Sequence, residues 1–396
     1  MEIAIVLWDN YLPVKLCTAS GAGPRVKLSL MLLESVEIEN FRNLEGSLCC
    51  GHSLNILVGF NGQGKTNWLE AIHILATTRS FKTTKLQETI RFGEDLAIIR
   101  GRVMRSEDIH RDLQAALQGN TKSFLVNGKR ETLQRYLGQL HAVVFNADEL
   151  EIVRGTPDAR RKFLDRGIVS IHPPYIQTLT DYNRVIKQKN SLLQAANDER
   201  NSLEKTAELL EPWNEQLVTY ATRIHRSRVR FVERLNEAFE TRLFGNEEIS
   251  IRYVSSLEGK GDLSDYERLL AERLKLRVQA EIAAGYALIG THRDDLEILL
   301  DGHDLRKYGS AGQQRSALLL LQLSNLSVYH AQQQEYPLFL LDDIDAELDY
   351  ERIGQLLEFL EGKTQTFVTT SKDSFVEKFG QNSRVFRVEN GAVKSL

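Results

Sequence analysis

The chain has 396 residues, of which 42% are hydrophobic and 26% are charged, and its formal net charge is −4. This composition is typical of a folded protein and excludes collagen-like, disordered and disulfide-scaffold classes. The negative net charge excludes a protein covered in basic charge, so any contact with DNA requires a local basic patch or an assembled state. The three cysteines form no CxxC pair, which argues against a zinc site. No segment approaches the ~20 apolar residues that cross a bilayer, so we expect a cytoplasmic protein without a membrane partner.

Residues 1–30 differ in pattern from the chain that follows. They contain Pro13, Pro24 and a Gly-Ala-Gly stretch, whereas a regular pattern begins at Met31. We interpret them as an N-terminal extension or a misplaced start. The alternative is an ordered cap on the domain.

Residues 31–150 are expected to form the first part of one lobe. Alternation predicts a strand over 32–39, and an apolar run predicts a buried strand over 54–58, directly before several glycines. Helical spacing follows over 65–76. Three further strands are predicted, at 97–103, 123–126 and 141–145.

The pattern changes near residue 157, and residues 151–330 are expected to form a second, mainly helical lobe. Helices are predicted at 175–197, 213–243 and 311–329, and strands at 249–254 and 296–300. Residues 331–396 then return to the first lobe, with strands at 337–341 and 366–370 around a helix at 350–361. Strands and helices that alternate at both ends predict an α/β fold with a mixed, largely parallel sheet.

The segment from Gly59 to Thr66 reads GFNGQGKT and satisfies the phosphate-loop pattern GxxxxGK[ST]. Glycines allow successive backbone N–H groups to curl around phosphate oxygens, and the next helix directs its N-terminus at the anion. Lys65 would reach the β- and γ-phosphates of ATP, and Thr66 would hold Mg²⁺. The loop lies between a strand and a helix, as the motif requires; the alternative is a glycine-rich turn without nucleotide. The candidate nucleotide ligands here are Gly59, Asn61, Gly62, Gln63, Gly64, Lys65, Thr66 and Asn67.

Two carboxylates end the apolar strand at 337–341. Asp342 would organise the Mg²⁺ shell, and Asp343 would orient or deprotonate an attacking water. Aspartate is also a common turn residue at strand ends, so the pattern is weak in isolation. Its combination with the phosphate loop favours the functional interpretation.

A second glycine motif, Ser310-Ala311-Gly312-Gln313, opens the helix predicted at 311–329. It offers an anion a hydroxyl, a bare backbone and the positive end of a helix dipole. The alternative is a simple N-cap by Ser310.

The order of these motifs resembles the ABC-type ATPases, in which the Ser-x-Gly motif of one subunit completes the nucleotide site of another. More closely, the chain resembles the RecF family of bacterial DNA repair ATPases, from about residue 33 to the C-terminus. Outside the three motifs above, the resemblance rests on segments spread along the chain: Ile38–Asn43, Leu69–Ile72, Arg79–Phe81, Gly155–Pro157, Arg160–Asp165, Trp213–Leu217, His292–Leu296 and Glu347–Asp349.

The resemblance implies an ATP-driven dimeric clamp on gapped duplex DNA, that is, on a junction of single and double strands. Ser310, Gly312 and Gln313 would close over the partner's nucleotide, Arg42 would reach the nucleotide in its own subunit, and Lys65 and Asp343 would act in catalysis. Aspartate is shorter than the glutamate usual at position 343, so a weak ATPase stimulated by DNA is expected. The family also implies work with RecO and RecR to promote RecA loading in gap repair, DNA replication and the SOS response.

Two rival functions remain open. An ABC transporter subunit would usually carry a histidine after the last core strand, where this chain has Thr369-Thr370-Ser371. The other rival is a DNA scaffold that does not hydrolyse ATP and keeps a relic nucleotide pocket. A chromosome-condensing rod is disfavoured, because the roughly 240 residues between the glycine motifs are too few for a long coiled coil at ~1.5 Å per residue.

Three basic groups are candidates for DNA contact. They are Arg223 with His225, Arg226, Arg228 and Arg230; Arg79 with Lys82 and Lys85; and Arg160 with Arg161 and Lys162. A basic group of this kind is more often a solvated or salt-bridged surface than a DNA contact. Our hypothesis is that the first two groups contact phosphates in the ATP-bound dimer.

Overall fold

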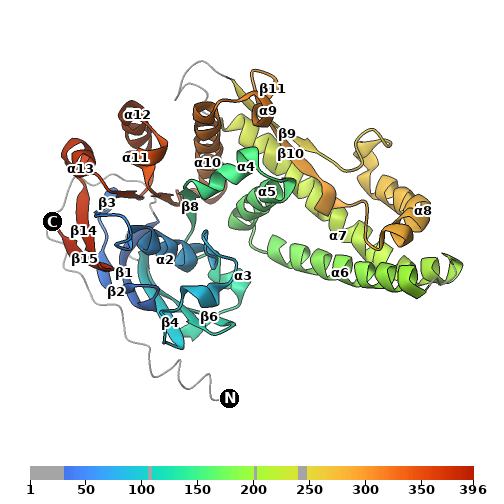
Figure 1. Ribbon diagram of the computed structural model, residues 1–396, viewed down its shortest axis with the longest axis horizontal. Coiled ribbons are helices and arrows are strands. Elements are labelled where there is room, and N and C mark those ends of the chain that lie inside the picture. Colours follow the sequence, from blue (N-terminus) through green and yellow to red (C-terminus); the bar gives the residue numbers. More distant parts are fainter. Residues whose placement is uncertain (1–30, 106–108, 200–202, 240–247) are drawn as a thin grey trace. The chain divides into compact units, whose positions relative to one another are not determined.

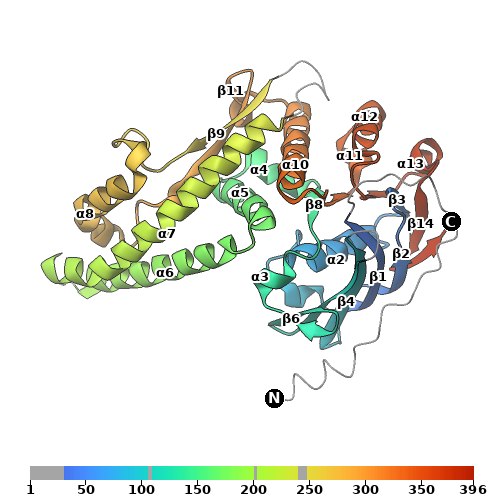
Figure 2. The same cartoon turned by 180° about the vertical axis from the view of Figure 1, so that it is seen from behind.

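The computed structural model describes residues 31–105, 109–199, 203–239 and 248–396 (Figures 1 and 2). The expected extension at residues 1–30 lies outside the described residues. The described residues form two compact units. The first contains residues 31–150 and 315–396, and the second contains the described residues from 151 to 314.

An antiparallel sheet of six strands forms one part of the first unit, in the order β2-β1-β4-β5-β6-β7. Its strands are β1 (Leu32–Phe41), β2 (Leu44–Cys49), β4 (Leu96–Met104), β5 (His110–Gln118), β6 (Thr121–Val126) and β7 (Lys129–Arg130). The turn Asn127-Gly128 joins β6 to β7, and both turn residues have positive φ, as this hairpin-turn pair favours.

The second sheet of this unit confirms the predicted mixed, largely parallel sheet. Its order is β15-β14-β3-β13-β12-β8, and every neighbouring pair is parallel except β14 with β15. Its strands are β3 (Leu54–Val58), β8 (Ala142–Phe145), β12 (Leu338–Leu341), β13 (Thr366–Thr370), β14 (Arg384–Glu389) and β15 (Ala392–Ser395). All four residues of β12 are buried, as a continuous apolar run in a central strand predicts.

Helix α2 (Lys65–Thr77) packs against both sheets. Its buried Trp68, Leu69 and Ile72 share one core cluster with side chains of both, such as Ile99 of β4 and Phe367 of β13. The unit also holds most of α10 (Ala311–Gln333) and several shorter elements: η1 (Leu86–Thr89), α3 (Leu133–Tyr136), η2 (Asp148–Leu150), α11 (Ile344–Glu347), α12 (Tyr350–Leu360) and α13 (Asp373–Phe379).

The second unit is mainly helical, as predicted. Its helices are α4 (Glu151–Arg154), α5 (Pro157–Ile171), α6 (Tyr175–Glu199), α7 (Leu203–Glu237), α8 (Tyr266–Ala284) and α9 (Leu305–Tyr308), with short turns η3 (Leu263–Asp265) and η4 (Thr291–Arg293). A small antiparallel sheet has the order β11-β10-β9, from His303–Asp304, Asp295–Leu300 and Ile249–Val254.

Helices α6, α7 and α8 pack together, as both views show (Figures 1 and 2). A fully buried ion pair, Lys189 Nζ to Glu281 Oε2 at 2.7 Å, joins α6 to α8, and Asn214 of α7 accepts a further bond from Lys189. The predicted start of α7 at 213 was wrong, because the helix begins at Leu203 and passes through Pro212. That proline is exposed, so water can satisfy the carbonyl that it leaves unpaired. Within the described residues, no helix combines the length and apolarity that crossing a membrane requires.

Candidate nucleotide site

The loop from Gly59 to Gly64 connects β3 to α2, and three of its positions require glycine. A Cβ on Gly59 would lie 2.4 Å from the carbonyl oxygen of Val388 on β14. Gly62 and Gly64 have φ of +80° and +108°, in the left-handed region that favours glycine. The motif therefore has the backbone curl that the sequence predicted.

Neighbouring groups hold this loop in place. Lys65 is almost fully buried, and its Nζ donates to the carbonyl oxygens of Gly59 at 2.9 Å and Phe60 at 3.1 Å. The turn between β14 and β15 binds Gln63 twice: Gly391 N donates to its backbone oxygen at 2.8 Å, and Asn390 N donates to its Oε1 at 2.6 Å. Sequence reasoning missed this support, although Asn390-Gly391 is a hairpin-turn signal.

The structure brings Thr66 and Asp342 together. Asp342 follows β12 and is 9% exposed. Its Oδ1 accepts hydrogen bonds from Thr66 Oγ1 at 2.9 Å and from Thr369 Oγ1 at 2.7 Å. Burial raises the pKa of the Asp342 carboxyl and the charge of Asp343 adds to the shift, whereas the two hydroxyl donors oppose it.

Asp343 is the second predicted acid, and its backbone has an unusual conformation. Its φ is 47° and its ψ is 43°, which is left-handed and costly for a residue other than glycine. Its N–H donates to Thr369 Oγ1 at 2.8 Å. Burial raises the pKa of the Asp343 carboxyl, and the nearby charge of Lys65 lowers it. A carboxylate that is perturbed in this way beside a phosphate loop is a candidate base.

Arg42 and Asn67 lie beside the loop in a polar network. The Arg42 guanidinium binds the buried Glu70 carboxylate through two hydrogen bonds, of 2.5 and 2.8 Å. Ser80 Oγ donates to the same carboxylate at 2.5 Å. Asn67 Nδ2 donates to Asn43 Oδ1 at 2.7 Å. Arg42 thus has an internal partner, and its contact with nucleotide stays a prediction.

The Ser310 motif lies in the second unit and forms a capping box. Gln313 N donates to Ser310 Oγ at 3.2 Å, and Ser310 N donates to Gln313 Oε1 at 2.8 Å. The capping interpretation is therefore confirmed. Among the described residues, a Cβ on Gly312 would meet no atom closer than Ser310 Oγ at 4.0 Å, so their packing does not require that glycine. A role toward a second subunit stays a prediction.

The three basic groups differ in their partners. Arg160 is buried and paired with Asp295 at 2.6 Å, and Lys162 pairs with Asp158 at 2.7 Å. In the second group, Lys82 Nζ donates to Asn67 Oδ1 at 3.1 Å, and Lys85 lies 3.9 Å from Glu88.

The group on α7 divides between two faces. Arg228, a member of the candidate DNA-contact group, is buried and bound to Asp165 at 2.8 and 2.9 Å, so its guanidinium group has an internal partner. His225 is also buried and stacks on Tyr266. Arg223, Arg226 and Arg230 are exposed, and among the described residues none of them forms an ion pair.

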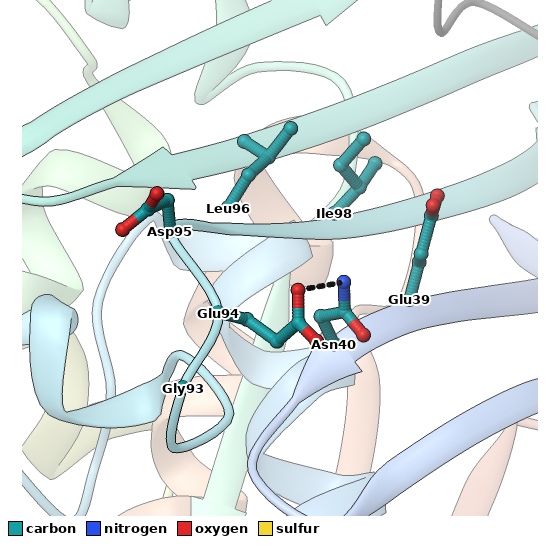
Figure 3. A pocket seen from close by; sticks show the side chains of 7 residues that line it. All are labelled: Glu39, Asn40, Gly93, Glu94, Asp95, Leu96 and Ile98. Atoms are coloured by element: carbon teal, nitrogen blue, oxygen red, sulfur yellow. Dashed lines mark hydrogen bonds between the residues drawn. The ribbon is translucent and has the colours of Figure 1, made fainter.

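A separate hollow on the first unit has the opposite charge (Figure 3). It is lined by Glu39, Asn40, Gly93, Glu94, Asp95, Leu96 and Ile98. Asn40 Nδ2 donates to Glu94 Oε2 at 3.3 Å across its edge. Its three carboxylates would repel a phosphate, so the phosphate loop remains the candidate nucleotide site.

Comparison with known proteins agrees with these motifs. Residues 32–394 match the family model described as "RecF/RecN/SMC N terminal domain". A "DNA replication and repair protein RecF" from Halothermothrix orenii is 34% identical in an alignment of 377 residues, and the match covers 92% of this chain and 98% of that protein.

Solved structures agree as well. A structure described as the recombination mediator protein RecF-ATPrS in the RecFOR pathway has a TM-score of 0.85 and 32% identity, and the match covers 93% of this chain and 99% of that chain. An Smc head domain from Pyrococcus furiosus has a TM-score of 0.52 at 17% identity, with 93% of this chain and 96% of that chain covered, and it supports the fold alone.

Proposed function

Because the chain belongs to the RecF family within the RecF/RecN/SMC group of proteins, we propose that it is an ATP-dependent DNA-binding ATPase of recombinational repair. In this proposal, two copies close around bound ATP and hold DNA, and hydrolysis releases them. The observation that carries the proposal is the hydrogen bond from Thr66 to Asp342, because it joins the phosphate loop to the acidic strand end in one site.

The loop residues bind the triphosphate. Backbone N–H groups between Gly59 and Thr66 surround its phosphates, and the α2 N-terminus faces them. Lys65 now donates to two loop carbonyls, and it exchanges these bonds for β- and γ-phosphate oxygens when ATP binds. Asn61, Gln63 and Asn67 line the same loop.

The donor set fits Mg²⁺. The Thr66 hydroxyl and the Asp342 carboxylate are hard oxygen donors that already lie 2.9 Å apart, a separation that suits two adjacent ligands of one small cation. When bound, Mg²⁺ neutralises charge on the β- and γ-phosphates. Asp342 then holds the cation directly or through water, and its buried carboxylate gains a counter-charge.

Asp343 orients or deprotonates the attacking water. Its raised pKa suits a base, but its side chain is one methylene shorter than the glutamate usual at this place. We therefore propose slow ATP hydrolysis that DNA accelerates. A slow reaction suits a protein in which hydrolysis times the release of the two copies.

Ser310, Gly312 and Gln313 of each copy complete the nucleotide site of the other. Support comes from the bare backbone at Gly312, which the packing of the residues that the structure describes does not explain. ATP then favours the closed dimer because only that state makes these contacts. The RecFOR pathway named for a similar structure supports RecO and RecR as partners. RecA loading as the outcome rests on the resemblance to the RecF family alone.

Sedimentation velocity tests the proposal. Wild type, Ser310→Arg and Ser310→Ala are compared with and without ATP and gapped DNA, and phosphate release is measured in the same samples. Wild type should dimerise with ATP and release phosphate faster with DNA. Ser310→Arg should stay monomeric because its side chain blocks the partner's nucleotide, whereas Ser310→Ala loses the hydroxyl but adds no bulk and should dimerise more weakly than wild type. ATP-induced pairing of Ser310→Arg equal to wild type would refute the clamp.

A further inference from the structure

Three hydroxyl side chains lie at the end of β13 or directly after it, and the structure gives each a different environment. Thr370 is buried, and its Oγ1 accepts from Lys372 N at 3.1 Å. Ser371 is exposed. Thr369 is fully buried and contacts both candidate acids. Its hydroxyl is therefore engaged inside the protein and does not face solvent.

The two bonds of Thr369 are compatible with each other. Its Oγ1 donates to Asp342 Oδ1 at 2.7 Å and accepts from Asp343 N at 2.8 Å. A hydroxyl has one hydrogen to donate and two lone pairs, so one threonine makes both bonds at once. Valine has the same shape and can make neither.

The sheet order places β13 beside the strands that lead into both motifs. β13 lies between β3, which leads into the phosphate loop, and β12, which leads into Asp342. Leu341 pairs with Val368 and Val58 pairs with Thr370, so Thr369 stands level with both strand ends.

These contacts fix two things that the reaction needs. Asp342 Oδ1 is held between Thr66 and Thr369, which sets the orientation of the carboxylate. Asp343 keeps its left-handed backbone only while its surroundings hold it, and its N–H is bound by Thr369.

We propose that Thr369 is a positioning residue of this site, whose hydroxyl sets Asp342 for the cation and Asp343 for the attacking water. The inference rests on the proposed ATPase function and adds a residue to it. Thr369 acts through the two aspartates and does not touch the nucleotide itself.

Three variants test this role. Thr369→Val removes both hydrogen bonds, and Thr369→Ser restores them. Thr366→Val is the matched control, because Thr366 is also buried on β13 and its hydroxyl makes only a 3.5 Å contact with its own segment. The measurements are kcat and KM for ATP, and the affinity for Mn²⁺, by electron paramagnetic resonance, in the presence of a non-hydrolysable ATP analogue.

Removing a side chain that orients a metal ligand commonly costs about 10–100-fold in metal affinity or activity, and we expect Thr369→Val to lose kcat and Mn²⁺ affinity in that range. KM for ATP should change much less, because the phosphate loop is intact. Thr369→Ser should recover most of both losses, and Thr366→Val should behave as wild type. Circular dichroism checks folding, and Thr369→Ala gives the same test if the valine variant unfolds.

The outcomes separate the two proposals. If wild type neither binds nor hydrolyses ATP, the proposed function fails. If wild type is active and Thr369→Val or Thr369→Ala matches Thr366→Val in kcat and Mn²⁺ affinity, the positioning role alone is overturned. Failure of Thr369→Ser to recover activity would also count against it.

Discussion

At the scale of single residues, local sequence patterns predicted the residues of the candidate site but not the residues that hold them in place. Gly59–Thr66, Asp342 and Asp343 could be found because phosphate loops and acidic strand ends have fixed local patterns. Thr369 and Asn390-Gly391 could not, because they reach the site through strand pairings with distant parts of the chain. Such contacts depend on sheet order, which no local pattern encodes.

The pairing of Arg42 with Glu70 is a further contact that no local sequence pattern predicted. The sequence resemblance assigns it to the nucleotide, whereas the structure pairs it with Glu70, whose side chain is fully buried. A buried carboxylate requires a partner, since an unpaired buried charge is costly. Arg42 therefore has a structural task whether or not it also contacts ATP.

Arg42→Ala should destabilise the first unit strongly. It leaves the Glu70 carboxylate with Ser80 as its hydrogen-bond donor, and breaking a buried pair costs about 3 kcal/mol or more. Urea unfolding followed by circular dichroism measures the loss. Adding Glu70→Gln should recover much of it, because no charge is then stranded. If ATP affinity also falls in the double variant, Arg42 contacts the nucleotide; if the double variant is no more stable than Arg42→Ala, the pairing argument is wrong.

At the scale of elements, strongly patterned segments were predicted well and ambiguous ones were missed. β3 and β13 have the predicted bounds, because their apolar runs are short and clearly ended. β5 reads HRDLQAALQ, which has no strand preference, and it is a strand because β4 and β6 pair with it on both sides. α8 was missed because apolar residues such as Leu276, which is 73% exposed, blur its pattern.

Helix α7 carries the surface that we expect to contact DNA. Arg223, Arg226 and Arg230 recur at helical spacing on its exposed side, while Arg228 points inward to Asp165. Within the part of the chain that the structure describes, these three guanidinium groups form no ion pair and are available to phosphates, whereas Arg160 is paired with Asp295.

The double variant Arg226→Ala with Arg230→Ala should bind gapped DNA more weakly in the presence of ATP. Each lost phosphate contact should reduce the slope of log affinity against log salt by about 1, so the expected change is about 2. Fluorescence anisotropy across a salt series measures both quantities. Arg268→Ala is the control, because Arg268 is an equally exposed arginine of the same unit that already pairs with Glu272. An equal loss in that control would show a general charge effect and no specific surface.

At the scale of the whole molecule, the alternation of strands and helices at both ends of the chain predicted that distant segments share one sheet. β8, β12 and β13 confirm this, since residues 142–145 pair with residues 338–341. Each unit also holds a half-buried histidine whose surroundings favour its neutral form. Burial lowers the pKa of His141 in the first unit to about 3 and that of His292 in the second to about 4.

Both units should therefore lose stability as the pH falls below about 6.5. The unfolded chain binds a proton on each histidine near pH 6.5 whereas the folded chain does not, so acid favours unfolding until the folded pKa is reached. For His292 the window is pH 6.5 to about 4. Its Nδ1 lies 2.7 Å from the Tyr182 hydroxyl, and Arg293, Arg161 and Lys189 oppose a further positive charge.

Urea unfolding at pH 7.5 and 5.0 tests this argument. The free energy of unfolding should fall less between the two pH values for His292→Gln than for wild type. His172→Gln, at an exposed histidine of the same unit, should keep the wild-type loss; equal losses in all three proteins would show that His292 does not set this dependence.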